Sequence, residues 1–112
     1  MAMSMYVADD RYIRMPKGDT LSFGLEFDGL DQDLDTAYFT CRRNFTEAPV
    51  FQKSLGNGIT KQDTEHYVVR VAPEDTKDLE AGKYYYDLEI GANGDVFTIL
   101  KGVLELERDV TF

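Results

Sequence analysis

The chain has 112 residues, of which 43% are hydrophobic, and its 21 acidic and 12 basic side chains give a formal net charge of −9. This length supports one domain with a single hydrophobic core. Binding to nucleic acid or to an anionic membrane needs clustered Lys and Arg, and the only adjacent basic pair is Arg42-Arg43. Neither kind of partner is therefore expected.

Residues 1–11 are expected to form a short leader in front of a single domain over residues 12–112. The first five residues lack the basic flank and apolar core of a secretory signal. No run of about 18 apolar residues is present, so no membrane span is expected. Cys41 is the only cysteine, which excludes an internal disulfide and suits synthesis in a reducing cytoplasm.

The first half of the domain shows strand patterns separated by turn residues. A short strand over residues 12–15 is followed by Pro-Lys-Gly-Asp. Residues 21–27 alternate apolar and small or polar side chains, the period of a half-buried strand. After a polar loop over residues 28–35, Cys41 belongs to the next inward row, and Tyr38 faces the other way.

The middle of the chain predicts a weaker strand followed by a turn. Residues 50–55 form the weaker strand, which is expected at a sheet edge with Val50 and Phe51 available to a partner. Gly56-Asn57-Gly58 is a strong turn signal. Residues 61–65 have the composition of an exposed turn, and residues 66–71 form the next strand.

A helical turn and a corner follow, and they organise the second half of the chain. Pro73 suits the first helical position, because its missing N–H has no partner there. Leu79 is expected to point inward, and Gly82 gives the backbone freedom that a corner needs. Tyr84 then opens an alternating strand, as in the tyrosine corner of an immunoglobulin-type sandwich. The alternative is that Tyr84 is only a large half-buried strand residue.

The last two strands are predicted to form a hairpin. Asn93-Gly94 lies between alternating runs and favours a two-residue turn. The final segment, residues 96–110, is long for one strand, and its inward row changes phase. A bulge or bend is expected at Gly102, where the change of phase falls.

About seven strands at this spacing predict an all-β, immunoglobulin-like β-sandwich with one short helical turn before the tyrosine-corner strand. No catalytic residues or cofactors are expected. His66 is the only histidine, and zinc needs several His or Cys ligands. Asp31, Asp33 and Asp35 resemble the start of a calcium loop, but the glycine and glutamate of a complete loop are missing. A solvated acidic loop is the favoured interpretation, and a weak oxygen-lined site that also uses Asp28 is the alternative.

The second half of the chain carries a family resemblance. The pattern Val-x-Pro-Glu-Asp-Thr-x-x-Leu over residues 71–79 precedes Ala-Gly-Lys-Tyr-Tyr-Tyr-Asp-Leu over residues 81–88. The strand over residues 96–106 then leads to Asp-Val-Thr at residues 109–111, and Lys-Gly-Asp-Thr at residues 17–20 precedes an early strand. This combination resembles small immunoglobulin-like domains of tailed bacteriophages and prophages, including the amino-terminal domain of baseplate upper proteins.

The resemblance covers roughly residues 12–111 and implies a non-enzymatic structural role in a baseplate, tail or head. It also implies other phage structural proteins as partners, a virion component made in the host bacterial cytoplasm, and a homo-oligomer on assembly. Baseplate upper proteins continue into a long carboxy-terminal region, so this chain resembles an isolated attachment domain. Candidate contact residues are Val50, Phe51, Tyr38 and Tyr85. The alternative is a module that binds carbohydrate or a cell-surface ligand through exposed tyrosines.

Overall fold

The computed structural model describes residues 11–108, so residues 1–10 of the expected leader and the segment from residue 109 onward lie outside the described part. Arg11 already belongs to the first strand. The described elements are β1 (Arg11–Pro16), β2 (Leu21–Glu26), β3 (Thr36–Arg42), β4 (Pro49–Leu55), β5 (Gly58–Asp63), β6 (His66–Val71), α1 (Pro73–Thr76), β7 (Gly82–Ala92) and β8 (Asp95–Glu107).

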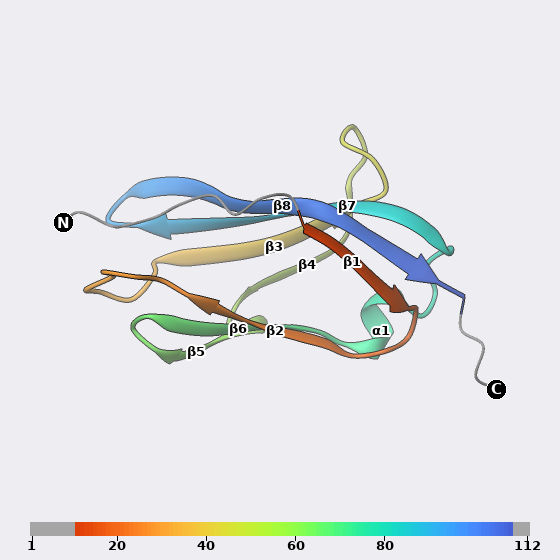
Figure 1. Ribbon diagram of the computed structural model, residues 1–112. Coiled ribbons are helices and arrows are strands. Elements are labelled where there is room, and N and C mark those ends of the chain that lie inside the picture. The colour runs from red at the N-terminus through yellow and green to blue at the C-terminus, as the bar shows by residue number, and fades with distance from the viewer. Residues whose placement is uncertain (1–10, 109–112) are drawn as a thin grey trace.

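The strands are hydrogen-bonded in the order β1-β8-β7-β3-β4-β5-β6-β2, and this series folds into a two-layer β-sandwich (Figure 1). One layer contains β1, β8, β7 and β3, and the other contains β5, β6 and β2. β4 runs between the layers, because it pairs antiparallel with β3 and, over two residues, parallel with β5. The outermost strands of the series are β1, which is parallel to β8, and β2, which is antiparallel to β6.

Apolar alternation places one continuous hydrophobic core between the layers. In β3, Phe39 and Cys41 are fully buried, whereas Tyr38 is exposed. In β7, Leu88 and Ile90 are buried in the same phase. Such alternation is what a sheet with one face on the core requires.

The short helix α1 forms where the sequence predicts it. Pro73 is its first residue, and the Ala72 N–H donates to Asp75 Oδ2 at 2.7 Å. The buried Thr76 hydroxyl accepts a hydrogen bond of 2.8 Å from the Gly18 N–H, which ties the helix to the turn after β1. This helix therefore closes one end of the sandwich (Figure 1).

The predicted hairpin turn and the predicted bulge are both present, but the bulge lies at a different residue from the one expected. The Asn93-Gly94 turn has φ values of 55° and 82°, as a two-residue hairpin turn requires. The register of β7 against β8 shifts where Leu88 pairs with Leu100 and Glu89 pairs with Thr98. The bulge therefore falls at Ile99, not at Gly102, because Ile99 and Leu100 both turn toward the core.

Two predictions about the middle of the chain were also wrong in detail. The segment over residues 50–55 is not an outermost strand of the series, because its end at Ser54 and Leu55 also pairs with β5; residues 50–53 are an edge in the local sense, since their ladder runs to β3 alone. β5 extends to Asp63, which includes part of the expected turn over residues 61–65. This strand is mostly exposed, so its polar composition resembled that of a turn.

The acidic loop over residues 28–35 is not wholly solvated. Leu30 and Leu34 are buried, and the Leu34 N–H donates to the Tyr67 hydroxyl at 2.9 Å. These two leucines attach the loop to the core, while its aspartates remain exposed. No helix among residues 11–108 is long and apolar enough to cross a membrane.

Candidate interaction surface

Exposed large hydrophobic side chains are confined to one face of the sandwich. Within residues 12–108, this group consists of Tyr12 (51% exposed), Tyr38 (37%), Phe45 (80%) and Val96 (65%). The strand register places Tyr12, Tyr38 and Val96 on the outward phase of β1, β3 and β8, and Phe45 stacks on the outward Tyr85 of β7. We call this face, formed by the outward residues of β1, β8, β7, β3 and β4, the outer face.

A cross-strand row runs across the middle of the outer face. Tyr12 pairs with Val103, Val103 with Tyr85, and Tyr85 with Arg42. The rings of Phe45 and Tyr85 lie 4.8 Å apart with an interplanar angle of 34°. Directly opposed side chains on a sheet are in reach of one another, so Tyr12, Val103 and Tyr85, with Phe45 stacked on Tyr85, form a continuous aromatic and apolar row that ends at Arg42.

The loop between β3 and β4 holds Phe45 in place. Asn44 Oδ1 accepts hydrogen bonds from the Thr46 N–H at 3.0 Å and the Thr46 hydroxyl at 2.8 Å, and its amide donates to Glu47 Oε1 at 2.8 Å. Arg42 donates to the Glu47 carbonyl at 3.0 Å. When an asparagine side chain accepts a hydrogen bond from the backbone two residues on, it mimics a backbone turn and gives a short loop a defined shape. The most exposed ring of the face therefore projects from an ordered loop.

Charged side chains border the row on the β1 side. The Tyr12 hydroxyl donates to the Glu105 carboxylate, and Arg14 lies 3.5 Å from the same carboxylate. The hydrogen bond from Tyr12, together with the charge of Arg14, lowers the pKa of Glu105, and Glu105 raises the pKa of Arg14. Lys83 Nζ lies 6.0 Å from the centre of the Tyr12 ring, within cation–π range. The Tyr12 ring is thereby held among charges of both signs.

A shallow polar depression of about 320 Å³ lies farther along the outer face, over β3, β4 and β7. Gln52 donates to the Thr40 hydroxyl at 2.9 Å across its floor, and Thr40 is only 5% exposed. The residues that line the depression carry aromatic, hydroxyl, amide, cationic and carboxylate groups: Tyr38, Thr40, Arg42, Gln52, Asp87 and Glu89.

The candidate contact residues chosen from the sequence separate into two groups. Tyr38 and Tyr85 lie on the outer face. Val50 and Phe51 instead pack against the core, with the Phe51 ring 6.2 Å from that of Phe39. Sequence reasoning missed Phe45, although a phenylalanine inside an otherwise polar loop was the available signal.

The predicted corner residues meet at the other end of β7. Tyr84 is buried, and its hydroxyl donates to the Glu80 carbonyl at 2.8 Å, which is the geometry of a tyrosine corner. Burial raises the pKa of Tyr84. The Arg43 guanidinium covers its ring at 4.7 Å from the centroid, and Gly82 adopts a φ of 138° just before it. Leu79 is half-buried against the core.

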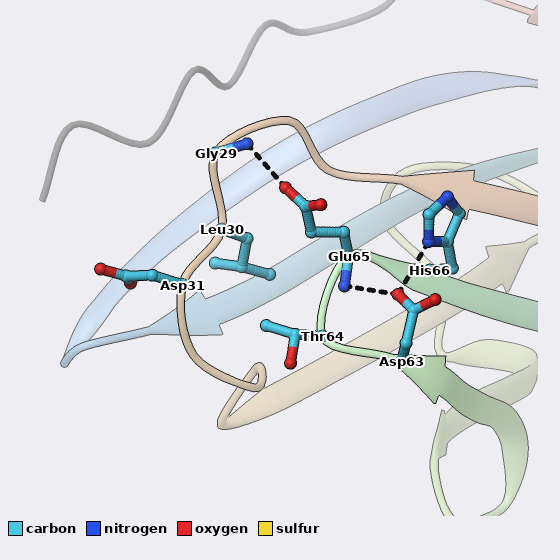
Figure 2. Close-up of a pocket in the computed structure, with 7 residues that line it drawn as sticks. All are labelled: Gly29, Leu30, Asp31, Asp63, Thr64, Glu65 and His66. Atoms are coloured by element: carbon cyan, nitrogen blue, oxygen red, sulfur yellow. Dashed lines mark hydrogen bonds and ion pairs between the residues drawn. The ribbon is translucent and has the colours of Figure 1, made fainter.

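An open depression of about 600 Å³ lies between the acidic loop and the turn from β5 to β6 (Figure 2). His66 Nδ1 is 2.7 Å from Asp63 Oδ1, and its Nε2 is 3.3 Å from Glu26 Oε2. The hydrogen bond with Asp63 is the main cause of a raised pKa of His66 and of a lowered pKa of Asp63. Glu65 is engaged as well, because its carboxylate accepts the Gly29 N–H at 2.9 Å (Figure 2).

The aspartates of the acidic loop do not converge. Asp33 binds Lys61 at 3.0 Å and the Thr64 hydroxyl at 3.3 Å, so its carboxylate is already occupied. Across residues 11–108, no three His, Cys, Asp or Glu side chains gather closely enough to hold a metal ion.

No protein-family model and no curated protein matches the sequence. The solved structures with a similar fold include CopC and an IG1-IG1 heterodimer. CopC from Methylosinus trichosporium OB3b shares 10% sequence identity with a TM-score of 0.50, over 95% of this chain and 98% of that one. The ZIG-8–RIG-5 IG1-IG1 heterodimer also gives 10% identity and a TM-score of 0.50, over 94% of this chain and 89% of that one. The fold is thus an immunoglobulin-like β-sandwich.

Proposed function

We propose that the protein is a non-enzymatic protein–protein interaction module that attaches to other components of a phage or prophage particle through its outer face. The observation that carries the proposal is the one-sided exposure of Tyr12, Tyr38, Phe45 and Val96. The outward residues of β2, β5 and β6 include no large hydrophobic side chain of comparable exposure among those that the structure describes. The phage setting is supported by the sequence resemblance over the corner and the last two strands.

The composition of the outer face suits a protein partner. Protein interfaces are enriched in aromatic residues and Arg, and their centre is surrounded by a polar rim. Here the rings of Tyr12, Tyr85 and Phe45 form the centre, and Arg14 and Arg42 lie beside it. A contiguous exposed apolar patch with such a rim is uncommon on a protein surface that has no binding role.

The test is binding to the structural proteins encoded beside this chain, each purified and titrated in a calorimeter. Phe45→Ser removes the most exposed ring and is expected to weaken binding at least about tenfold. Val68→Ser is the control on the other layer, where the half-buried Val68 pairs with Gly24 and Thr60, and circular dichroism checks that both variants are folded. Equal binding by the wild type and Phe45→Ser, or loss of binding in Val68→Ser alone, would contradict the proposed surface.

The polar depression supports a second candidate, a module that binds carbohydrate or a cell-surface ligand. An exposed tyrosine beside amide, guanidinium and carboxylate groups offers a stacking surface and several hydrogen-bonding groups for a polyhydroxylated ligand. Tyr38→Ala and Asp87→Asn test this candidate in glycan binding, with Phe45→Ser as the variant that is expected to have no effect. Glycan binding that depends on Tyr38 and not on Phe45 would favour this function over protein attachment.

A further inference from the structure

We propose that the partner of the outer face is a second copy of this chain, bound face to face about a twofold axis. The inference rests on the proposed function and names the partner of the same surface. Three features of the described residues support it: the charge balance of the face, the projecting Phe45 ring and the depression beside Tyr38.

Charge distinguishes the outer face from the remainder of the chain. The whole chain carries 21 acidic and 12 basic side chains. On the outer face the balance is nearly even. Its cations are Arg14, Arg42, Lys83 and Lys101, and its carboxylates are Asp87, Glu89, Glu105 and Glu107. Two strongly acidic copies repel one another less where they meet through a face on which the charges balance.

The order of charges on the face is compatible with twofold pairing. Arg42 and the carboxylates of Asp87 and Glu89 lie around the same depression. In a twofold interface the same patch is used by both copies, so Arg42 of each copy can meet the carboxylates of the other. A patch that contains both signs is self-complementary, whereas a purely acidic patch would repel its copy.

Phe45 and the depression provide complementary shapes. The β3–β4 loop projects above the layer that contains β7 and β8 (Figure 1), and Phe45 on that loop is 80% exposed. The depression of about 320 Å³ offers the Tyr38 ring and the Arg42 guanidinium, both of which can stack on an aromatic ring. Twofold symmetry lets each copy insert its Phe45 beside Tyr38 of the other.

The net charge of −9 on each copy gives the dimer a distinctive response to salt. Raising ionic strength screens the repulsion between the exposed acidic remainders of the two chains. The aromatic contacts and the pairs of Arg42 with the partner's carboxylates are affected less, because the interface shields them from solvent. Self-association is therefore expected to tighten with salt. A complex with a basic protein would respond in the opposite direction.

Sedimentation equilibrium of the full chain at about 50 and about 500 mM sodium chloride tests the proposal. We expect a monomer–dimer equilibrium that is tighter at the higher salt concentration. Phe45→Ser is expected to weaken dimerisation at least about tenfold, while Val68→Ser leaves it unchanged. Circular dichroism of both variants checks that they are folded. A strict monomer at both salt concentrations, a dimer weakened by salt, or a dimer insensitive to Phe45→Ser would each overturn the proposal.

The proposed dimer and the proposed attachment function can fail independently of one another. If the chain is a monomer but Phe45→Ser still abolishes binding to another structural protein, the twofold dimer is wrong and the attachment function stands. If the chain neither dimerises nor binds such a protein through this face, both proposals fail.

Discussion

The ammonium group of Lys53 lies 2.7 Å from Asp75 Oδ2, and the two side chains are only 13% and 14% exposed. This ion pair joins β4 to α1, two elements that are far apart in the sequence. The same carboxylate oxygen accepts the Ala72 N–H, so Asp75 also caps the helical turn. One aspartate therefore connects the strand between the layers to the helix that closes the sandwich.

Removing either member of this pair is expected to destabilise the fold. Asp75→Asn leaves the Lys53 charge largely buried without its counter-charge, and Lys53→Met leaves the carboxylate in the same position. Because the pair is not fully buried, we expect each change to lower the free energy of unfolding by about 1–3 kcal/mol. Urea denaturation of the two variants and of the double variant measures the coupling. A coupling energy near zero would show that the pair contributes nothing.

Tyr84→Phe is expected to lower the free energy of unfolding by about 0.5–1.5 kcal/mol, because it removes the hydrogen bond from the hydroxyl to Glu80. Tyr85→Phe is the matched control, since Tyr85 is the next residue of β7 and faces outward. Its effect should stay within about 0.5 kcal/mol. Equal effects of the two substitutions in thermal or urea unfolding would contradict a stabilising corner at Tyr84.

His66 predicts a pH dependence of stability. Its partners Asp63 and Glu26 raise its pKa above the ordinary value of 6.5, so the folded state binds the proton more tightly than the unfolded state. The stabilisation is therefore complete below about pH 6.5 and is lost as the pH rises through the raised pKa. Wild type should lose stability between about pH 6.5 and 8 relative to His66→Gln. Parallel pH profiles of the two proteins would contradict this.

Asp63 gives the opposite dependence on the acid side. Its pKa is lowered from 3.8, first by the hydrogen bond with His66 and then by the Glu65 N–H. The unfolded state therefore takes up a proton before the folded state does, and the stabilisation is lost as the pH falls through the lowered pKa. Asp63→Asn should flatten the acid limb of a urea-unfolding profile below about pH 4. An unchanged acid limb would argue against the contact.

Cys41 is expected to be inert in the folded protein. Its side chain is fully buried, and burial raises the pKa of the thiol to about 12. The reactive thiolate is therefore scarce at neutral pH, and reagents reach it only after the chain opens. Labelling by a disulfide reagent should be at least about a thousandfold slower in buffer than in denaturant. Rapid labelling under native conditions would contradict the position of Cys41 in the core.

Patterns within single segments of the sequence correctly predicted strand alternation and the hairpin turn, because both depend on neighbouring residues only. The alternation in β2, β3 and β7 follows from which face meets the core, and Asn93-Gly94 meets the backbone requirement of its turn. The bulge was predicted at Gly102 because a glycine inside a strand often marks a bulge. In the structure, the register shift is at Ile99, where consecutive apolar residues both turn inward.

Long-range features of the candidate surface could not be predicted in the same way. The parallel pairing of β1 with β8 brings Tyr12 beside Val103, residues from opposite ends of the chain. The stacking of Phe45 on Tyr85 depends on how β3 pairs with β7. No periodicity within one segment encodes such neighbours, so the outer face is seen only when all of its strands are assembled.

The central claim is that association uses the outer face, and amide chemical shifts measured by NMR over a concentration series test it most directly. The account predicts that the largest shifts, from about 0.02 to about 1 mM, fall on Tyr12, Tyr38, Phe45, Tyr85 and Val96, while the outward residues of β2, β5 and β6 change little. Shifts confined to the β2, β5 and β6 layer, or to the depression around His66, would contradict it.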